Sequence, residues 1–376
     1  MQSRRWWLAA FLTVLLGGAG APAVHAAAKP ALDLSTASIS DMTSFAQKHA
    51  KDLQAACRAG KLDVAARVRD EVLGVLDPAS KPPAKGVFDY SGEVVTAFAP
   101  QLRVNAKADP NVTIEAANNA LALNAAVIVC NPALDYLTND RALGEALQNR
   151  SAGVRYWAAK GIDAHMPSLV VQLPVAVVGT GGGNGLLRII KADLTGKKEV
   201  SALVAGRLHV ALVHTVLAVR DTPIAAQLLN VMGDSMVQRA DAWQKAAPSE
   251  ADITSATESL AALVEVVGKP ANLDLGAARG NVLSATCGYM SYALQWDAQQ
   301  KANPANDPIS PEVYQLVTKG SALIEAATGF VPPALTPSTP ALDALLQVNG
   351  AVGPGGGFFA KFKDINQPGN IPAGEK

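Results

Sequence analysis

The sequence is poor in cysteine, with three cysteines among 376 residues, and Cys57, Cys130 and Cys287 lie far apart in the chain. At most one disulfide bond can form, so at least one thiol stays unpaired. We expect all three to be buried thiols that pack as small apolar side chains, and a single structural disulfide stays open as the alternative. The sequence also lacks the close Cys and His spacings that bind zinc. It therefore predicts no metal site and no cofactor.

The chain also has few aromatic residues and no net charge. Aromatic residues make up 5% of the chain, and 32 Lys and Arg residues balance 32 Asp and Glu residues. A chain without net charge carries no electrostatic footprint for nucleic acid or an anionic membrane, so we expect no nucleic-acid partner. The chain is instead rich in apolar residues, with 49% hydrophobic against 17% charged, and Ala, Val and Leu predominate. This composition excludes disorder of the whole chain and favours closely packed helices.

Residues 1–28 have the composition of an export signal. Two adjacent arginines precede an apolar run, Trp6–Leu16, and small residues follow it. The run is shorter than the roughly 20 residues that a membrane-spanning helix needs. We predict cleavage after Ala26 or Ala28 and a mature protein in the periplasm or outside the cell, without a transmembrane span. The paired arginines leave a twin-arginine route open beside the ordinary secretory route.

Helical spacing of apolar residues recurs after this signal, and strand-like alternation is almost absent. Proline and glycine separate the helical stretches. We predict an all-α protein with five parts: a signal peptide (1–28), an N-terminal helical pair (29–78), a linker rich in Pro and Lys (79–90), a helical array (91–330) and a largely disordered C-terminal tail rich in Pro and Gly (331–376). We expect one short helix in this tail near residues 341–348, and its cluster Phe358–Phe362 is a candidate docking segment.

The most organised stretch is RSAGVRYWAAKGI, residues 150–162. One face of a helix would carry its residues Val154, Trp157, Ala158 and Ile162. We therefore expect Trp157 to be buried in the core and Arg155 to point away from this apolar stripe. The preceding helix places Leu143 and Leu147 on one face in the same way, and only a short link separates the two helices. A link this short predicts an antiparallel helical hairpin.

This hairpin resembles a HEAT repeat over about residues 138–163. In that family a short first helix is followed by a second helix that opens with Val-Arg and continues with small residues. The matching positions here hold Leu143, Leu147, Val154, Arg155, Ala158 and Ala159. Asn149 stands where the family usually has Asp, which is the usual ionic partner of the repeat arginine. The resemblance implies an irregular α-solenoid of stacked antiparallel helix pairs, with one continuous core and an extended surface for partners. The spacing of the other helix pairs is irregular.

Two stretches have features of catalytic or ligand-binding motifs. The glycines within Val177–Ile190 follow an apolar run, but their spacing fits neither a dinucleotide fingerprint nor a nucleotide loop, so we expect an inter-helix loop. The segment MGDSM, residues 232–236, resembles the nucleophile block of the GDSL hydrolases and has Ser235 in the serine position. The other blocks of that family are missing from the sequence, and the surrounding pattern is helical. We therefore predict no catalytic residue from these motifs.

The histidines give no metal signature. His209 and His214 share a predicted helix, but five residues leave them about 140° apart around its axis, so one zinc ion cannot bind both. His165 stands beside Pro167, where we expect a helix end and a capping or solvated role for the histidine. Each histidine therefore has an ordinary structural interpretation.

We favour an exported, non-catalytic HEAT-like scaffold or interaction module that binds a protein or cell-envelope partner through a helix-lined surface. The sequence leaves enzymatic activity, partner identity and oligomeric state open. One alternative is an extracytoplasmic hydrolase or enzyme subunit that acts on polymers. That alternative requires a concave pocket in which His209, His214 or Ser235 meets an acidic partner. The other alternative is a structural component of a surface layer or matrix.

Overall fold

A computed structural model describes residues 32–77, 82–135, 137, 140–179, 185–195, 201–220, 222–268, 271 and 273–353. Within these ranges the chain forms helices joined by turns, and its β contact is an isolated antiparallel bridge between Pro308 and Pro340. The all-α fold class predicted from the sequence is confirmed for this part of the chain. Residues 1–28, which include the predicted signal peptide, lie outside the described residues.

The helices follow one another with short connections. Those of the first half are α2 (Ile39–Arg58), α3 (Leu62–Gly74), α4 (Ala84–Phe98), the 3-10 helix η2 (Ala99–Arg103), α5 (Val112–Val129), α6 (Asp140–Leu147), α7 (Ala152–Gln172) and α8 (Pro174–Val178). Those of the second half are α9 (Leu186–Thr195), α10 (Ala202–Ala218), α11 (Pro223–Lys245), α12 (Glu250–Val267), η4 (Gly276–Ala278), α13 (Arg279–Gln300), α14 (Pro311–Thr328) and α15 (Ala341–Ala351).

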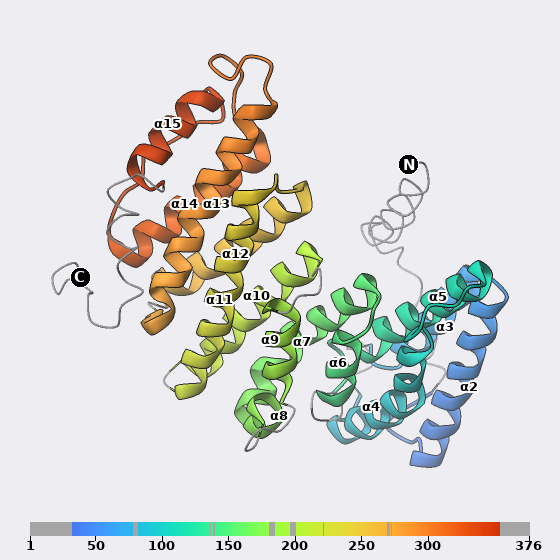
Figure 1. The fold of residues 1–376 in the computed structure, drawn as a ribbon. Helices are drawn as coiled ribbons and strands as arrows, with labels where there is room; N and C mark the ends of the chain where they lie inside the picture. Colours follow the sequence, from blue (N-terminus) through green and yellow to red (C-terminus); the bar gives the residue numbers. More distant parts are fainter. Residues whose placement is uncertain are drawn as a thin grey trace.

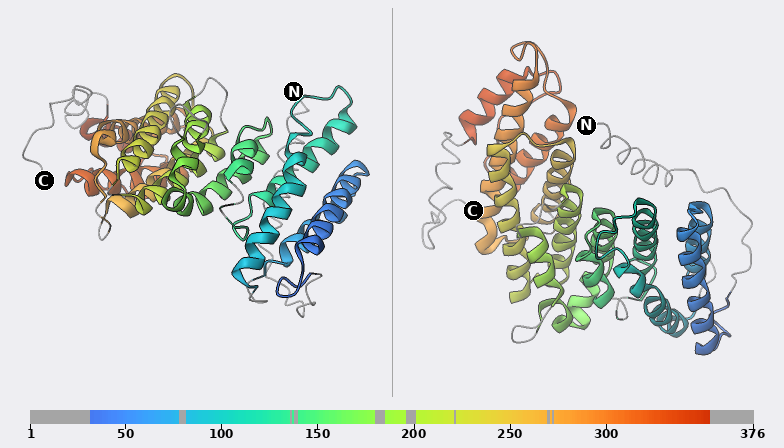
Figure 2. Two further views of the ribbon diagram at one scale, coloured as in Figure 1. Left: turned by 90° about the horizontal axis from the view of Figure 1, so that it is seen from below. Right: turned by 45° about the vertical axis from the view of Figure 1, so that its right-hand side comes forward.

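From α6 onward, helix contacts form two parallel series. In one series α7 contacts α10, α10 contacts α12, and α12 contacts α14. In the other series α6 contacts α9, α9 contacts α11, α11 contacts α13, and α13 contacts α15. Figures 1 and 2 show the helices succeeding one another along an elongated array, with α2 to α5 at one end and α13 to α15 at the other. Each helix of a series therefore packs beside the next member of the same series.

The buried apolar side chains form one continuous core cluster, from Leu34 to Val352. Close helix approach within it depends on small residues. A Cβ atom added at Gly206 on α10 would lie 2.5 Å from Oγ of Ser255 on α12, and one at Gly161 on α7 would lie 2.8 Å from the carbonyl oxygen of Cys130. The absence of a side chain at these two glycines allows the neighbouring backbones to approach closely.

The N-terminal helices join the same core. A capping box starts α2, because the Ser38 hydroxyl accepts from the Asp41 backbone N–H while the Asp41 carboxylate accepts from the Ser38 backbone N–H. Both α2 and α3 contact α5, and α2 also contacts α4. Helix α4 begins at Ala84, within the segment predicted to be a linker, because Pro83 adopts an extended conformation and serves as the residue before the first turn.

The described part of the predicted C-terminal tail, residues 331–353, folds back onto the array. The Ile309 backbone N–H donates to the Thr339 carbonyl oxygen at 3.1 Å, and the Ala341 N–H donates to the Asp307 carbonyl oxygen at 2.9 Å. Helix α15 then packs on α13 and buries Ala344 and Val348. This segment is therefore folded, whereas Phe358–Phe362 lies outside the described residues.

Among the described helices, α5 is long and apolar enough to cross a membrane by length and composition, with a mean hydropathy of 1.4. In the structure it contacts η2, α2, α3 and α7, and its C-terminal half is the buried part. Such a helix also occurs in the core of a folded domain. The absence of a transmembrane span after signal cleavage stays a prediction.

Candidate functional site

The hairpin singled out in the sequence consists of α6 and α7, which contact each other. Five of the residues expected on the apolar faces of this hairpin are fully buried, with no exposed surface: Leu143, Leu147, Val154, Ala158 and Ile162. Helix α7 continues past the expected end to Gln172, with Pro167 inside it. The expectation of a helix end at His165 was therefore wrong. His165 is buried, and its Nε2 lies 3.1 Å from the carbonyl oxygen of Asn131, which is the bond that ties α7 to the end of α5.

Arg155 serves the turn between α6 and α7. Its guanidinium donates to the carbonyl oxygens of Asn149 at 2.9 Å and Arg150 at 3.0 Å, and its Nε lies 3.9 Å from a carboxylate oxygen of Asp193 on α9. Asn149 is itself buried, and its side-chain oxygen accepts from the Ser151 backbone N–H at 2.8 Å. Arg155 thus binds the Asn149 backbone instead of an acidic side chain at that position. This arrangement closes the turn and contacts the next helix pair.

Trp157 differs from the expectation of full burial. Its ring packs against the core from the edge and is only partly buried. The Lys160 ammonium lies 4.4 Å from the centre of the ring, and Tyr156 meets the ring edge-on with centroids 6.5 Å apart. The physical reason is its place at the side of the stripe, where α7 turns from the core towards the surface. Trp157 is therefore a partly exposed residue whose ring lies beside a cation.

A group of charged side chains extends from Trp157 across three helices of one series. Asp163 on α7 lies 3.2 Å from an Arg207 nitrogen and 2.6 Å from Nδ1 of His214, both on α10. Glu265 on α12 also acts electrostatically on His214. We call these residues the surface cluster: Trp157, Lys160, Asp163, Arg207, His214 and Glu265. The cluster reaches solvent, since the side chains of Arg207 and His214 are 33% and 44% exposed.

The pKa shifts in the surface cluster follow from these contacts. The hydrogen bond that His214 donates to the Asp163 carboxylate raises the pKa of His214 above its usual value, and partial burial acts in the opposite direction. The pKa of Lys160 is lowered, first by burial and then by the positive charge of Arg207. Asp163 therefore lies between Arg207 and His214 and contacts both.

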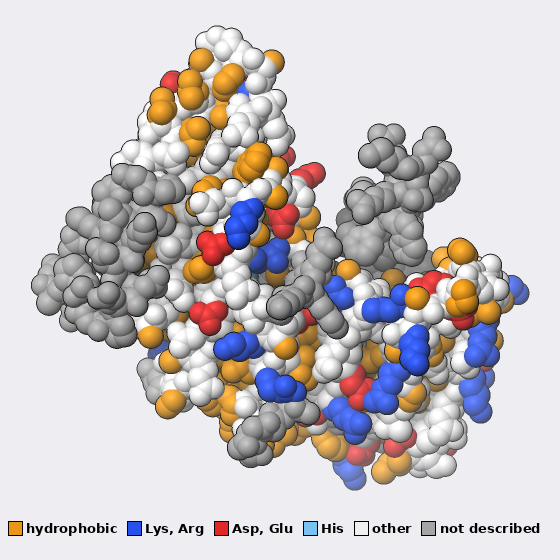
Figure 3. Space-filling model, viewed as in Figure 1, with side chains coloured by type: hydrophobic (Ala, Val, Ile, Leu, Met, Phe, Trp, Pro, Cys, Tyr) orange, Lys and Arg blue, Asp and Glu red, His pale blue; other side chains and the backbone are white. Residues whose placement is uncertain are grey.

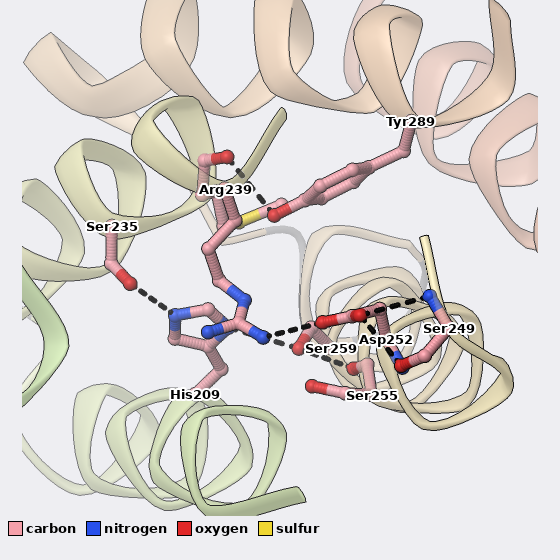
Figure 4. A network of polar contacts seen from close by, with 9 residues as sticks. His209, Ser235, Arg239, Ser249, Asp252, Ser255, Ser259 and Tyr289 are labelled. Atoms are coloured by element: carbon pink, nitrogen blue, oxygen red, sulfur yellow. Dashed lines mark hydrogen bonds and ion pairs between the residues drawn. The ribbon is translucent and has the colours of Figure 1, made fainter. Parts of the chain in front are cut away.

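A second polar group lies fully inside the protein, where α10, α11 and α12 meet (Figure 4). His209 Nε2 lies 3.0 Å from Oγ of Ser235, and its Nδ1 lies 3.0 Å from Oγ of Ser259. The Ser259 hydroxyl donates to the Ser255 carbonyl oxygen at 2.8 Å. Ser259 must therefore accept from Nδ1–H of His209, which leaves Nε2 as the acceptor for the Ser235 hydroxyl.

This serine and histidine pair does not have the surroundings of a hydrolase site. The partner of Nδ1 is the Ser259 hydroxyl, whereas a catalytic triad places a carboxylate there. Burial lowers the pKa of His209 to about 3, and the nearby Arg239 adds to the shift. Ser235 and His209 are 0% and 1% exposed, so a substrate cannot reach them. The pair holds three helices together as a neutral hydrogen-bonded network.

The acid drawn beside this network, Asp252, is already paired (Figure 4). Asp252 binds an Arg239 nitrogen at 3.1 Å and closes the capping box of α12 with Ser249 (Figure 4). The Tyr289 hydroxyl donates to the Met236 carbonyl oxygen at 3.0 Å and links α13 to α11. These contacts surround the histidine with structural partners.

His209 and His214 lie on different sides of α10, as their spacing predicts. His209 is buried towards α11 and α12, whereas His214 is exposed and contacts Asp163 on α7. Within the described residues no three His, Cys, Asp or Glu side chains are grouped to hold a metal ion. The three cysteines are buried free thiols, and burial raises the pKa of each, to about 11 for Cys57 and about 12 for Cys287.

The part of the surface formed by the described residues includes two open grooves. The larger has a volume of about 670 Å³ and lies between the N-terminal ends of α7, α10 and α12 and the C-terminal half of α11, with Arg155, Trp243 and Arg239 in its wall. The smaller, of about 460 Å³, lies between α2 and α3 over a floor that includes Ala56 and Val68. Both arginines of the larger groove already face carboxylates, so the groove has little unmatched charge.

Charge is unevenly distributed although the net charge is zero. On the face shown in Figure 3, Lys and Arg side chains gather over the part that contains α3 to α6, and the part around α15 shows mostly hydrophobic and uncharged side chains. Between residues 326 and 353 the sequence has one charged residue, Asp343. A balanced composition therefore does not exclude local charged surfaces.

Sequence reasoning did not identify the partners of the two histidines. Ser259 and Asp163 are 50 and 51 residues away from His209 and His214 respectively. Both separations correspond to about one helix pair along the chain, and this shared spacing is the sequence feature that could have indicated the two partners. Comparison of the chain with protein-family models, with curated proteins and with solved structures found no match.

Proposed function

We propose that this protein is an exported, non-catalytic HEAT-like α-solenoid that binds a protein or cell-envelope partner through the helix-lined surface of α7, α10 and α12. The two contact series of helices support the solenoid. Hydrogen bonds between successive members recur at similar sequence separations: 50 for His209 and Ser259, 51 for His214 and Asp163, and 53 for Trp296 and Trp243. In a solenoid each repeat contacts its neighbours, which produces such regular separations.

The surface cluster is the observation that carries the binding proposal. It combines a partly exposed Trp157 with charged side chains from three successive helices, and aromatic and Arg side chains are enriched at protein interfaces. The buried polar network, in contrast, is satisfied internally and has no route to a substrate. Binding therefore accounts for the exposed polar features better than catalysis does.

Site-specific photo-crosslinking in native cells tests this proposal. A photoreactive benzoylphenylalanine replaces Tyr156, beside the surface cluster, and a matched control replaces Arg141 on α6, whose side chain is 84% exposed. We expect a discrete crosslinked product at Tyr156 and none at Arg141. Equal products at both positions, or none at either, would contradict a specific partner surface at α7.

Export has its own test. Cell fractionation and N-terminal sequencing of the mature protein should find it outside the cytoplasm, beginning after Ala26 or Ala28. If the protein is recovered from the cytoplasm and still begins at Met1, this result would contradict export and leave the binding proposal standing.

A hydrolase is the second candidate, because the Ser235 hydroxyl is within hydrogen-bond reach of His209. That function requires an opening motion that exposes both residues. Turnover in a screen of ester and polymer substrates, lost in a folded Ser235→Ala variant, would support the hydrolase and reject the non-catalytic scaffold. Turnover that survives Ser235→Ala would assign the activity to another site.

A further inference from the structure

We propose that residues 358–362, with the sequence FFAKF, dock on the outer face of α15 and cover this end of the helix array. The outer face is defined by Leu342 and Leu346, which are 37% and 62% exposed. This contact within the chain is independent of the partner surface proposed on α7, α10 and α12.

The outer face of α15 is unusual for a helix at the end of an array (Figure 1). Helix α15 is the last member of its contact series among the described residues, and it buries Ala344 and Val348 where it packs on α13. Leu342 and Leu346 are four residues apart and share a different face of the helix. Because terminal helices of a solenoid ordinarily have a polar outer face, two exposed leucines there indicate a surface that another apolar element covers.

The segment that leads into α15 is also apolar. Phe330 and Val331 are exposed in it, and Asp343 is the one charged residue between residues 326 and 353. On the face shown in Figure 3, the part around α15 has mostly hydrophobic and uncharged side chains. An occupant that is rich in apolar side chains and carries little charge matches such a surface.

The FFAKF sequence has this character. It combines three phenylalanines with one lysine, Lys361. Asp343 is exposed on α15 three residues before Leu346, so the two side chains are neighbours on the helix surface. The phenylalanines would remove the leucines from water, and Lys361 would pair with the carboxylate beside them.

The connection to α15 has a suitable length. Leu346 lies seven residues before Gly353, and residues 354–357, Pro-Gly-Gly-Gly, follow Gly353. Seven residues correspond to about 10 Å along a helix. The five residues from Gly353 to Phe358 can span up to about 17 Å, and glycines permit a reversal of chain direction. The first phenylalanine can therefore reach Leu346.

This tether favours the chain's own segment over a second copy of the protein. A segment joined by a short linker has an effective concentration of about 1 mM or more at the site. A second copy at micromolar concentration must also lose translational and rotational freedom when it binds. The same apolar face is therefore occupied more readily from within the chain.

Photo-crosslinking within the purified mature chain tests the inference. Benzoylphenylalanine replaces Phe359, and mass spectrometry maps the product. We expect an intrachain crosslink to residues 341–351, with a yield that does not change on dilution. Leu346→Glu should lower this yield by about fivefold to tenfold, because it places a charge beneath the phenylalanine rings. Gln347→Glu makes the same charge change at the next exposed residue of α15 and should leave the yield unchanged.

A charge exchange tests the polar contact. Lys361→Glu should lower the crosslink yield by about twofold, since an exposed ion pair contributes little, and the addition of Asp343→Lys should restore it. If the double variant has the same low yield as Lys361→Glu, the proposed pairing of Lys361 with Asp343 is wrong.

The inference would be overturned by the absence of an intrachain crosslink, by a crosslink to another part of the chain, or by equal yields in Leu346→Glu and Gln347→Glu. Crosslinked dimers whose yield rises with protein concentration would assign the face of α15 to a second copy instead. In native cells, a product with another protein and no intrachain crosslink would assign it to that partner. Circular dichroism confirms that each variant is folded.

Discussion

Acidification should destabilise this protein through His209. The imidazole is buried and neutral, and burial lowers its pKa from the ordinary 6.5 to about 3. In the unfolded chain the same histidine takes up a proton near pH 6.5. The unfolded state therefore binds more protons between these two values. The free energy of unfolding falls as the pH falls through 6.5, and this group has no effect well above that pH.

The magnitude follows from one titrating group. Below its unfolded pKa, His209 lowers the free energy of unfolding by about 1.4 kcal/mol for each pH unit. Between pH 6.5 and about pH 4.5 this amounts to about 2 kcal/mol, because the unfolded histidine is only half protonated at the upper limit. The effect is large because the ring is fully buried, and the positive charge of Arg239 lowers its pKa further.

The assay is urea unfolding followed by far-ultraviolet circular dichroism at several pH values, for the wild type and for His209→Gln. Glutamine keeps a donor and an acceptor but does not titrate. Since His165 and His214 remain in both proteins, the difference between the two pH slopes isolates His209. We expect the wild type to lose about 1.4 kcal/mol more per pH unit than the variant below pH 6.5. Parallel slopes would refute a neutral, buried His209.

Three further predictions test the packing. Gly206→Val should destabilise the protein by about 2 kcal/mol or more, because a Cβ there meets Ser255 at 2.5 Å, whereas Gly74→Val, with nothing within 4 Å, should change the urea midpoint little. Trp157→Ala should lower the free energy of unfolding by about 2 kcal/mol, which is below the range for a fully buried Trp, because Trp157 is only partly buried. If the tryptophan emission maximum is unaltered in Trp157→Phe, this result would contradict the partial exposure of Trp157. Ser235→Ala leaves an acceptor of His209 unsatisfied and should cost about 1–3 kcal/mol in thermal or urea unfolding, and a neutral result would argue against the hydrogen bond.

Local patterns predicted much of the fold. The apolar spacing around Val154 and Ile162 and the short link before them predicted two adjoining helices with buried faces, and both residues are fully buried. Helix ends were harder to predict. Pro167 argued for a boundary, but α7 continues through it because packing outweighs one lost backbone hydrogen bond.

The candidate sites show a stronger dependence on tertiary structure. The sequence around Ser235 predicted no catalytic site. The contact between Ser235 and His209 arises only because α10 and α11 pack together. The structure also shows that this contact is buried. The surface cluster likewise combines residues from α7, α10 and α12, none of which has a motif of its own.

The sequence alone determined the helical class, the pairing of α6 with α7 and the burial of their apolar faces, since these depend on periodicity within a few turns of chain. Tertiary structure decided which helix lies beside which, and therefore whether a polar side chain is enclosed or exposed. His209 and His214 make the difference plain, because one helix carries both, yet packing against α11 and α12 encloses the first and leaves the second at the surface beside Asp163. Burial and charge depend on neighbours distant in sequence, and their identity is set only when the helices pack.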